Sequence, residues 1–186
     1  MIIIVRVSKK PRAVHTLQLL RDFENRSIRK ADFDLTEATV QFHGQGTISN
    51  PQVLELAGRD FGPSMAGFAD NFAFGTLKIE SGTVLELADL FDNGNRYGGK
   101  AEALYVGDLF LGTGATLDCA GLNLYYVNLT DNGGIITDGT PIFVPEPATL
   151  ALILSGFLVL AGQARRRAAP ARTVRPHRGQ RLTSRT

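Results

Sequence analysis

The most regular pattern in this chain is an alternation of apolar and polar residues that begins just after residue 31. Apolar side chains recur at Phe33 and Leu35 and again at Val40 and Phe42, with polar neighbours between them. A repeat of two residues is typical of a β-strand with one buried face. Similar short runs follow and are separated by turns rich in glycine. The pattern therefore predicts a mainly β domain over residues 31–144.

An internal repeat indicates that these strands stack into coils. Residues 77–89, LKIESGTVLELAD, align without a gap on residues 109–121, LFLGTGATLDCAG, at an offset of 32. Apolar residues match at one parity on either side of Gly82 in the first copy and Gly114 in the second. Residues 33–42 form a weaker third copy. Stacked rungs bury such a strip of matching apolar side chains, so we expect a small right-handed parallel β-helix.

The lengths of the expected strands distinguish this fold from a β-sandwich. The pattern predicts strands at 104–106, 109–111, 116–119 and 122–126, with a corner at Gly107-Asp108. These runs are shorter than the strands of about five to six residues that are usual in sheets. We therefore favour the β-helix and keep the β-sandwich as the alternative.

The C-terminal region has a different pattern, which ends the β domain. Pro145, Glu146 and Pro147 come first, and the prolines favour an extended backbone that exposes the acid between them. Residues 148–162 then contain no charge. Their Leu, Ile, Val and Phe side chains together favour the bilayer centre by roughly 3 to 4 kcal/mol.

This apolar run predicts a transmembrane helix, although a buried helix of a soluble core would be similarly apolar. The run would span about 22 Å, compared with a hydrocarbon core of about 30 Å. Arg165, Arg166 and Arg167 follow it. Three adjacent arginines cannot share a protein core, but they can reach lipid headgroups and so extend a short span. The positive-inside tendency then places the arginines in the cytoplasm and the β domain outside.

In this order and near a C-terminus, Pro145-Glu146-Pro147, the apolar run and the arginine cluster resemble the PEP-CTERM sorting signal of exported bacterial proteins. The resemblance implies that an exosortase, an integral-membrane enzyme similar to cysteine transpeptidases, recognises the Pro-Glu-Pro motif. It also implies that the anchor is removed and that the protein reaches the cell surface or the extracellular matrix. Residues 70–130 are similar, less specifically, to repeat domains of PEP-CTERM and autotransporter-passenger-like surface proteins.

Two features differ from the usual sorting-signal protein. Residues 168–186 continue past the arginine cluster, and we expect a disordered Arg-rich tail in contact with anionic lipid. Residues 1–30 are basic and lack the order of charges and apolar run that a secretory signal needs. We expect this segment to be poorly ordered or to form a short helix over residues 14–29. We interpret the chain as beginning short of its true start; the alternative is a cytoplasmic protein whose tail inserts alone.

The charges are strongly segregated along the chain. Residues 1–30 have a net charge of +6, residues 31–144 have a net charge of −11, and residues 163–186 contain eight arginines and no acid. An acidic domain has the wrong sign to neutralise phosphates. We therefore expect no nucleic-acid partner.

Residues that could support catalysis or metal binding are sparse. Cys119 is the lone cysteine and takes the place of Leu87 in the repeat, so we expect a small buried apolar residue. Asp92-Asn93-Gly94-Asn95 and Asp131-Asn132-Gly133-Gly134 offer the oxygen ligands that calcium prefers, but turns explain their spacing better. We therefore predict no catalytic residue, no metal and no cofactor.

The sequence thus predicts a non-enzymatic exported protein, anchored in the inner membrane as an intermediate and then delivered to the cell surface or outside the cell. Its predicted partners are an exosortase and inner-membrane lipid. The alternative function is a polysaccharide-binding module with exopolysaccharide as its partner, for which four tyrosines would need to be exposed: Tyr97, Tyr105, Tyr125 and Tyr126. A third candidate, a polysaccharide-cleaving enzyme, would use acids such as Asp108 and Asp118.

Overall fold

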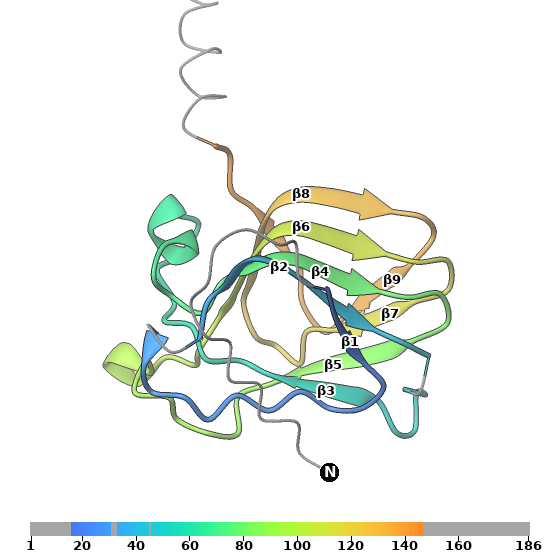
Figure 1. Ribbon diagram of the computed structural model, residues 1–186, viewed down its shortest axis with the longest axis horizontal. Coiled ribbons are helices and arrows are strands. Elements are labelled where there is room, and N and C mark those ends of the chain that lie inside the picture. Colours follow the sequence, from blue (N-terminus) through green and yellow to red (C-terminus); the bar gives the residue numbers. More distant parts are fainter. Residues whose placement is uncertain (1–15, 31–32, 45, 147–186) are drawn as a thin grey trace, which may run out of the picture. The chain divides into compact units, whose positions relative to one another are not determined.

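The structure is a computed structural model that describes residues 16–30, 33–44 and 46–146 (Figure 1). These residues form strands and connections with two short 3-10 helices, η2 (Met65–Phe68) and η3 (Tyr97–Gly99). The strands are β1 (Thr16–Leu19), β2 (Leu35–Phe42), β3 (Gln52–Glu55), β4 (Phe74–Ile79), β5 (Val84–Ala88), β6 (Leu104–Leu111), β7 (Thr116–Asp118), β8 (Leu124–Asp131), β9 (Ile135–Thr137) and β10 (Ile142–Phe143). The predicted mainly β character of the domain is confirmed.

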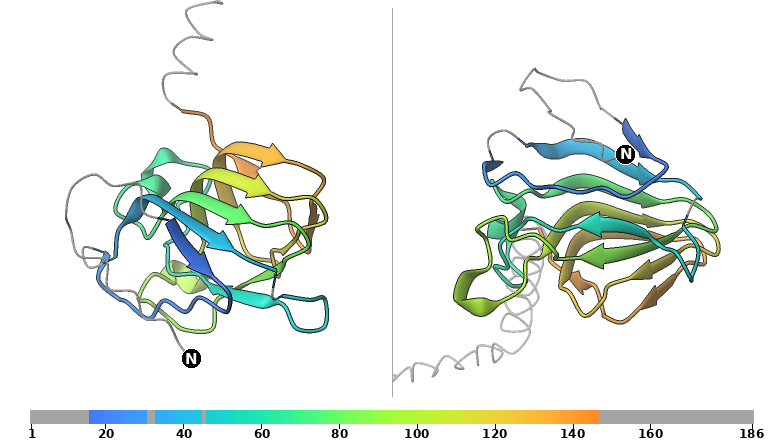
Figure 2. Two further views of the ribbon diagram at one scale, coloured as in Figure 1. Left: turned by 45° about the vertical axis from the view of Figure 1, so that its right-hand side comes forward. Right: turned by 90° about the horizontal axis from the view of Figure 1, so that it is seen from below.

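The strands form two parallel sheets. Sheet A has the order β1-β2-β4-β6-β8-β10, and sheet B has the order β3-β5-β7-β9. From β2 onward the chain alternates between the sheets, so each strand lies beside one from the next coil (Figures 1 and 2). This arrangement is compatible with the predicted β-helix, whereas a β-sandwich consists mainly of antiparallel pairs. The right-handed twist of the coils stays a prediction.

The register of the strands follows the internal repeat of the sequence. Leu77 pairs with Leu109 in sheet A, and Leu85 pairs with Leu117 in sheet B, both at the predicted offset. All four side chains are buried. The two turn glycines of the repeat have positive φ angles of 71° and 67°, a conformation that favours glycine. The predicted alignment of the two copies is therefore confirmed.

Part of the N-terminal segment belongs to the β domain. β1 pairs with β2, and Leu19 at its end is fully buried. Phe23 forms a parallel bridge with Leu54, and its ring centroid lies 5.9 Å from that of Phe33. The helix predicted over residues 14–29 is therefore wrong from residue 16 onward. Leu19 and Phe23 fill the end of the core from an extended chain, and this tertiary packing overrides the local helical spacing.

A kink in sheet A differs from the predicted strand boundaries. β6 runs through Gly107 and Asp108 as one strand, whereas the sequence predicts a corner between two strands there. The residues on either side, Val106 and Leu109, are three positions apart and both lie in the main core. Gly107 and Asp108 therefore face outward together, and the strand bends without ending.

The same kink recurs in β4, where Gly75 and Thr76 lie between two core residues. A β-carbon on Gly75 would lie 2.5 Å from the backbone oxygen of Thr36. A β-carbon on Gly107 would lie 2.7 Å from the backbone oxygen of Gly75. These separations are too short for a side chain, so aligned kinks in neighbouring strands require glycine at equivalent positions.

The buried carboxylate of Glu102 fixes the long connection between β5 and β6 by hydrogen bonds to its backbone. Glu102 Oε1 accepts hydrogen bonds from the backbone N–H groups of Asn93 at 2.9 Å and Asn95 at 3.3 Å. Its other oxygen is buried and has no hydrogen-bond partner among the described residues. Burial raises the pKa of Glu102 to about 7, and the nearby carboxylate of Asp89 adds to the rise. The folded state therefore favours the neutral acid.

We predict that Gly107→Ala destabilises the domain by about 1–3 kcal/mol, because the new methyl group must displace the backbone of β4. Thermal unfolding followed by circular dichroism measures this change. Gly114→Asn is the control, and it should destabilise less: no atom lies within 4 Å of a β-carbon at this turn, and asparagine adopts its positive φ at a smaller cost than most residues. Equal stability of Gly107→Ala and the natural protein would show that the kink does not need glycine.

We predict that Glu102 makes the domain less stable as the pH rises from about 4.5 to about 7. The folded pKa lies above the ordinary value of 4.5, so the folded state binds more protons in this window and loses stability on deprotonation. Glu102→Gln should reduce this slope and stabilise the protein above pH 7, by up to about 3 kcal/mol. A smaller slope of the same sign should remain, because burial also raises the pKa of Glu55. Unfolding midpoints at pH 5 and pH 8 provide the measurement, with Glu86→Gln as the control. The same slope in Glu102→Gln would contradict the assignment.

Candidate functional site

The described chain ends in a short segment that is bound to the last coil. β10 pairs with β8 at the edge of sheet A, with Ile142 opposite Tyr125. The backbone N–H of Val144 then donates a hydrogen bond of 2.8 Å to the carbonyl oxygen of Tyr126. The Val144 side chain is only 2% exposed. The chain is therefore packed and hydrogen-bonded as part of the domain up to Val144, the residue before the Pro-Glu-Pro motif.

Val144 packs into a second apolar cluster, separate from the main core. Its other buried members are Ala73, Ala103, Tyr105 and Tyr125. The two tyrosine rings stack with centroids 4.6 Å apart. The Tyr105 hydroxyl donates to the carbonyl oxygen of Gly62, and the Tyr125 hydroxyl donates to the carboxylate of Asp60. These contacts fasten the loop between β3 and β4 over the cluster.

The tyrosines that motivated the polysaccharide alternative are therefore mostly unavailable. Tyr105 and Tyr125 are buried, which corrects the expectation that they are exposed. Tyr126 is half-buried and packs against the main core. Tyr97 is 70% exposed, and the Arg59 guanidinium lies 4.0 Å from its ring centroid. Alternation alone could not show that a loop covers this part of the sheet.

The structure describes only part of the predicted sorting signal. Pro145 is half-buried and Glu146 is exposed. Pro147, the apolar run at 148–162 and the cluster of Arg165, Arg166 and Arg167 lie outside the described residues. Within residues 16–146, apart from the gaps in the description, no helix is long and apolar enough to cross a membrane.

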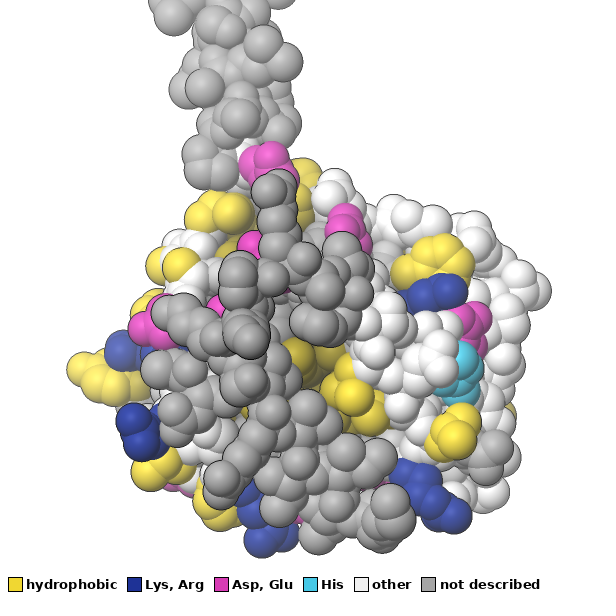
Figure 3. All heavy atoms as spheres, viewed as in Figure 1, with side chains coloured by type: hydrophobic (Ala, Val, Ile, Leu, Met, Phe, Trp, Pro, Cys, Tyr) yellow, Lys and Arg dark blue, Asp and Glu magenta, His cyan; other side chains and the backbone are white. Residues whose placement is uncertain are grey.

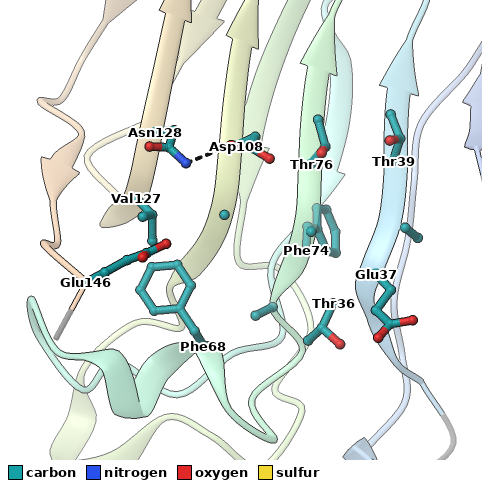
Figure 4. A pocket seen from close by; sticks show the side chains of 14 residues that line it. Thr36, Glu37, Thr39, Phe68, Phe74, Thr76, Asp108, Val127, Asn128 and Glu146 are labelled. Carbon is teal, nitrogen blue, oxygen red and sulfur yellow. Dashed lines mark hydrogen bonds between the residues drawn. The ribbon is translucent and has the colours of Figure 1, made fainter. Parts of the chain in front are cut away.

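Glu146 lies at one end of a groove on the outer side of sheet A (Figure 4). The groove has a volume of about 390 Å³. It crosses the aligned kinks of β4 and β6 and continues over β2 and β8. Its lining residues are Thr36, Glu37, Ala38, Thr39, Phe68, Ala73, Phe74, Gly75, Thr76, Gly107, Asp108, Val127, Asn128 and Glu146. We call this feature the outer groove.

A row of polar side chains forms one wall of the outer groove. Thr39 pairs with Thr76, Thr76 with Asp108, and Asp108 with Asn128, each from the neighbouring strand. The Asn128 amide donates a hydrogen bond of 2.9 Å to Asp108 Oδ1. Figure 4 shows these four side chains in line across the sheet, with Phe68 opposite them. The pattern of apolar and polar residues did not predict this groove, although Gly75 and Gly107 have the same offset as the repeat.

The two loops considered for calcium form ordinary turns. Asp92 accepts a hydrogen bond of 2.8 Å from the backbone N–H of Gly94. Asp131 accepts hydrogen bonds from the backbone N–H groups of Gly133 and Gly134, at 2.9 and 2.7 Å. In the part of the chain that the structure describes, no group of three His, Cys, Asp or Glu residues is arranged to hold a metal ion.

The residues considered for catalysis do not come together. Asp108 lies in sheet A between Thr76 and Asn128, whereas Asp118 lies in sheet B beside Glu86. Cys119 is fully buried, as predicted, and burial raises the pKa of its thiol to about 11. A buried thiol with a raised pKa is a poor nucleophile at neutral pH.

Comparison with known protein families matches the C-terminal region of the chain. Residues 143–167 match the PEP-CTERM protein-sorting motif. Neither a curated protein nor a solved structure matches the chain significantly. The match supports the predicted exosortase as a partner, and the motif implies export and a membrane-anchored intermediate before surface display. The matched segment begins inside β10, so the folded domain and the sorting motif overlap at Phe143 and Val144.

We predict that Val144→Ala loosens the end of the chain without unfolding the domain. Removing two buried methyl groups should cost about 1–2.5 kcal/mol of local stability. Hydrogen exchange of the amide at position 144 should therefore accelerate roughly tenfold. Phe143→Ala, at a side chain that is 53% exposed, should accelerate it less. Equal exchange rates in the two variants would mean that Val144 does not hold the segment.

Proposed function

We propose that this chain is a non-enzymatic exported protein whose β domain is displayed at the cell surface by exosortase-dependent sorting. One observation carries the proposal: the matched sorting motif starts on the last strand of a folded domain and continues directly into the Pro-Glu-Pro sequence. The domain is then the part that is displayed, and the segment after Val144 is the sorting signal that directs it there. Residues 148–162 hold the intermediate in the inner membrane, and Arg165, Arg166 and Arg167 orient it.

The close connection between domain and motif sets a condition for processing. Glu146 is two residues beyond Val144, which limits its distance from this buried anchor to about 7 Å. The exposed Glu146 is nevertheless reachable from outside the domain, as its place beside the outer groove indicates (Figure 4). The exosortase therefore acts immediately beside the folded domain.

We infer that the domain acts without catalysis. The outer groove is lined by three carboxylates, Glu37, Asp108 and Glu146, and its lining contains no Lys, Arg, His or Cys. Cys119 is shielded from solvent. A structural part of the cell surface needs an ordered domain and an anchor. Residues 16–146 contain the ordered domain, and the proposal assigns the anchor to residues 148–162.

We predict that processing depends on the exosortase, and intact-mass spectrometry of the chain from host cells with and without this enzyme is the test. A mature form that ends near Pro145 should occur only when the enzyme is present. The membrane fraction of the strain without it should hold the full-length chain. An unchanged full-length mass in both strains would contradict the proposed sorting.

Variants tested by the same mass spectrometry and fractionation distinguish the role of the Pro-Glu-Pro motif from that of the apolar run and the arginines. Replacing Pro145, Glu146 and Pro147 together by alanine should stop processing but keep the chain in the membrane fraction. Deleting residues 148–167 should abolish membrane association, because the deletion removes the apolar run and the arginines. Glu37→Gln, a change within the domain, should affect neither step. Unchanged fractionation after the deletion would exclude the membrane-anchored intermediate.

A further inference from the structure

We propose that the outer groove binds a polysaccharide that carries free hydroxyl and amino groups, with its chain running across the strands of sheet A. This inference goes beyond sorting and does not depend on it, because it rests on the groove alone. Four properties of the groove lead to it: its shape, the kinds of polar group that line it, its aromatic wall and its charge.

The shape of the groove suits an extended polymer. Neighbouring strands lie about 4.8 Å apart, so the row from Thr39 to Asn128 extends about 14 Å over four strands. Gly75 and Gly107, at the kinks, line the groove beside this row. A linear chain can therefore lie along the row and meet an equivalent polar group at each strand.

The lining offers the groups that recognise sugars. The hydroxyls of Thr39 and Thr76 can both donate and accept hydrogen bonds. The Thr36 hydroxyl donates to Asp34 Oδ1 at 2.6 Å and can still accept, and the Asn128 amide keeps one N–H and its oxygen for a ligand. Glu37 and Glu146 are exposed, and neither has a hydrogen bond or ion pair with another described residue. Their carboxylates are therefore available to accept hydrogen bonds from ligand hydroxyl or ammonium groups, which are stronger when the donor is charged.

Phe68 supplies an apolar wall. Its ring and the ring of Tyr105 form a nearly perpendicular pair, with centroids 5.3 Å apart, and this contact holds Phe68 in position. It lines the groove opposite the polar row (Figure 4). A rigid aromatic face can pack against the apolar C–H face of a sugar ring while the row binds the hydroxyl edge.

The negative charge of the groove determines which class of polysaccharide it favours. The charged residues of the lining are all acids, and the nearby Lys78 is engaged by Glu80 at 2.8 Å. On the face that Figure 3 shows, most of the visible Lys and Arg side chains lie toward the edges. An anionic polymer would be repelled by Glu37, Asp108 and Glu146, whereas an ammonium group would be attracted. The groove is thus complementary to an amino-bearing polymer.

The test measures binding of three soluble oligosaccharides to the full-length chain in detergent micelles by isothermal titration calorimetry. The probes are chitosan oligomers with free amino groups, neutral chitin oligomers of the same length, and anionic oligogalacturonate. We expect the chitosan oligomers to bind most tightly, and their affinity to fall with salt because the attraction is screened. Absence of chitosan binding, equal binding of the neutral oligomer, or tighter binding of oligogalacturonate would overturn the proposal.

Matched variants distinguish the groove from a general effect of acidic charge. Glu37→Gln combined with Asp108→Asn removes two charges from the groove and should weaken chitosan binding at least tenfold. Glu86→Gln combined with Asp118→Asn removes two charges from sheet B, where these residues are paired, and should leave the affinity unchanged. Thr39→Val combined with Thr76→Val should weaken binding severalfold, and Thr130→Val on the same face should not.

Circular dichroism melts of each variant establish that the domain is folded at the temperature of the titration. Equal weakening by the two charge pairs would show that chitosan binds by overall charge, and this would also overturn the proposal. Processing by the exosortase is unaffected in all these variants if they fold. A loss of chitosan binding is therefore distinguishable from a failure of sorting.

Discussion

The structure depends on one constraint, the in-register stacking of parallel strands. Each coil must present apolar side chains at the same depth and parity as the coils on either side, or the shared core is interrupted. The pairs of Leu77 with Leu109 and of Leu85 with Leu117 meet this condition in both sheets. Because register is fixed in this way, any local departure from a regular strand must be repeated in the neighbouring coil.

The kinks of sheet A are such a departure. Gly75 and Gly107 are neighbours across the sheet, and each lacks a β-carbon because an adjacent backbone occupies its place. The requirement for stacking thus turns a single irregularity into a continuous groove. The same register aligns Thr76 with Asp108 along its wall. A feature that arises from packing therefore positions the polar groups that a ligand could use.

Much of this fold could be predicted from the sequence, because the stacked coils repeat the same apolar pattern at a fixed offset. The sequence predicted the β domain, the alignment of residues 77–89 with 109–121 and the burial of Cys119. It could not give the course of β6 through Gly107, because a glycine beside an aspartate is equally typical of a corner and of a kink. It also misplaced Tyr105 and Tyr125, whose burial depends on a loop distant in sequence. A loop that covers residues distant from it in sequence leaves no periodic pattern from which to predict the burial. The sorting motif, in contrast, was recognisable because its parts are contiguous in the sequence.

The position of the sorting motif follows from the same architecture. In a stacked domain each coil contacts mainly its neighbours, so only the last coil determines how the chain departs. β10 contributes two residues to the edge of sheet A, and Val144 then packs into the second apolar cluster. A short edge strand offers little backbone for pairing with another chain. The last coil thus ends the sheet and determines that the chain leaves the domain after Val144, and coils added upstream would lengthen the domain without changing this point.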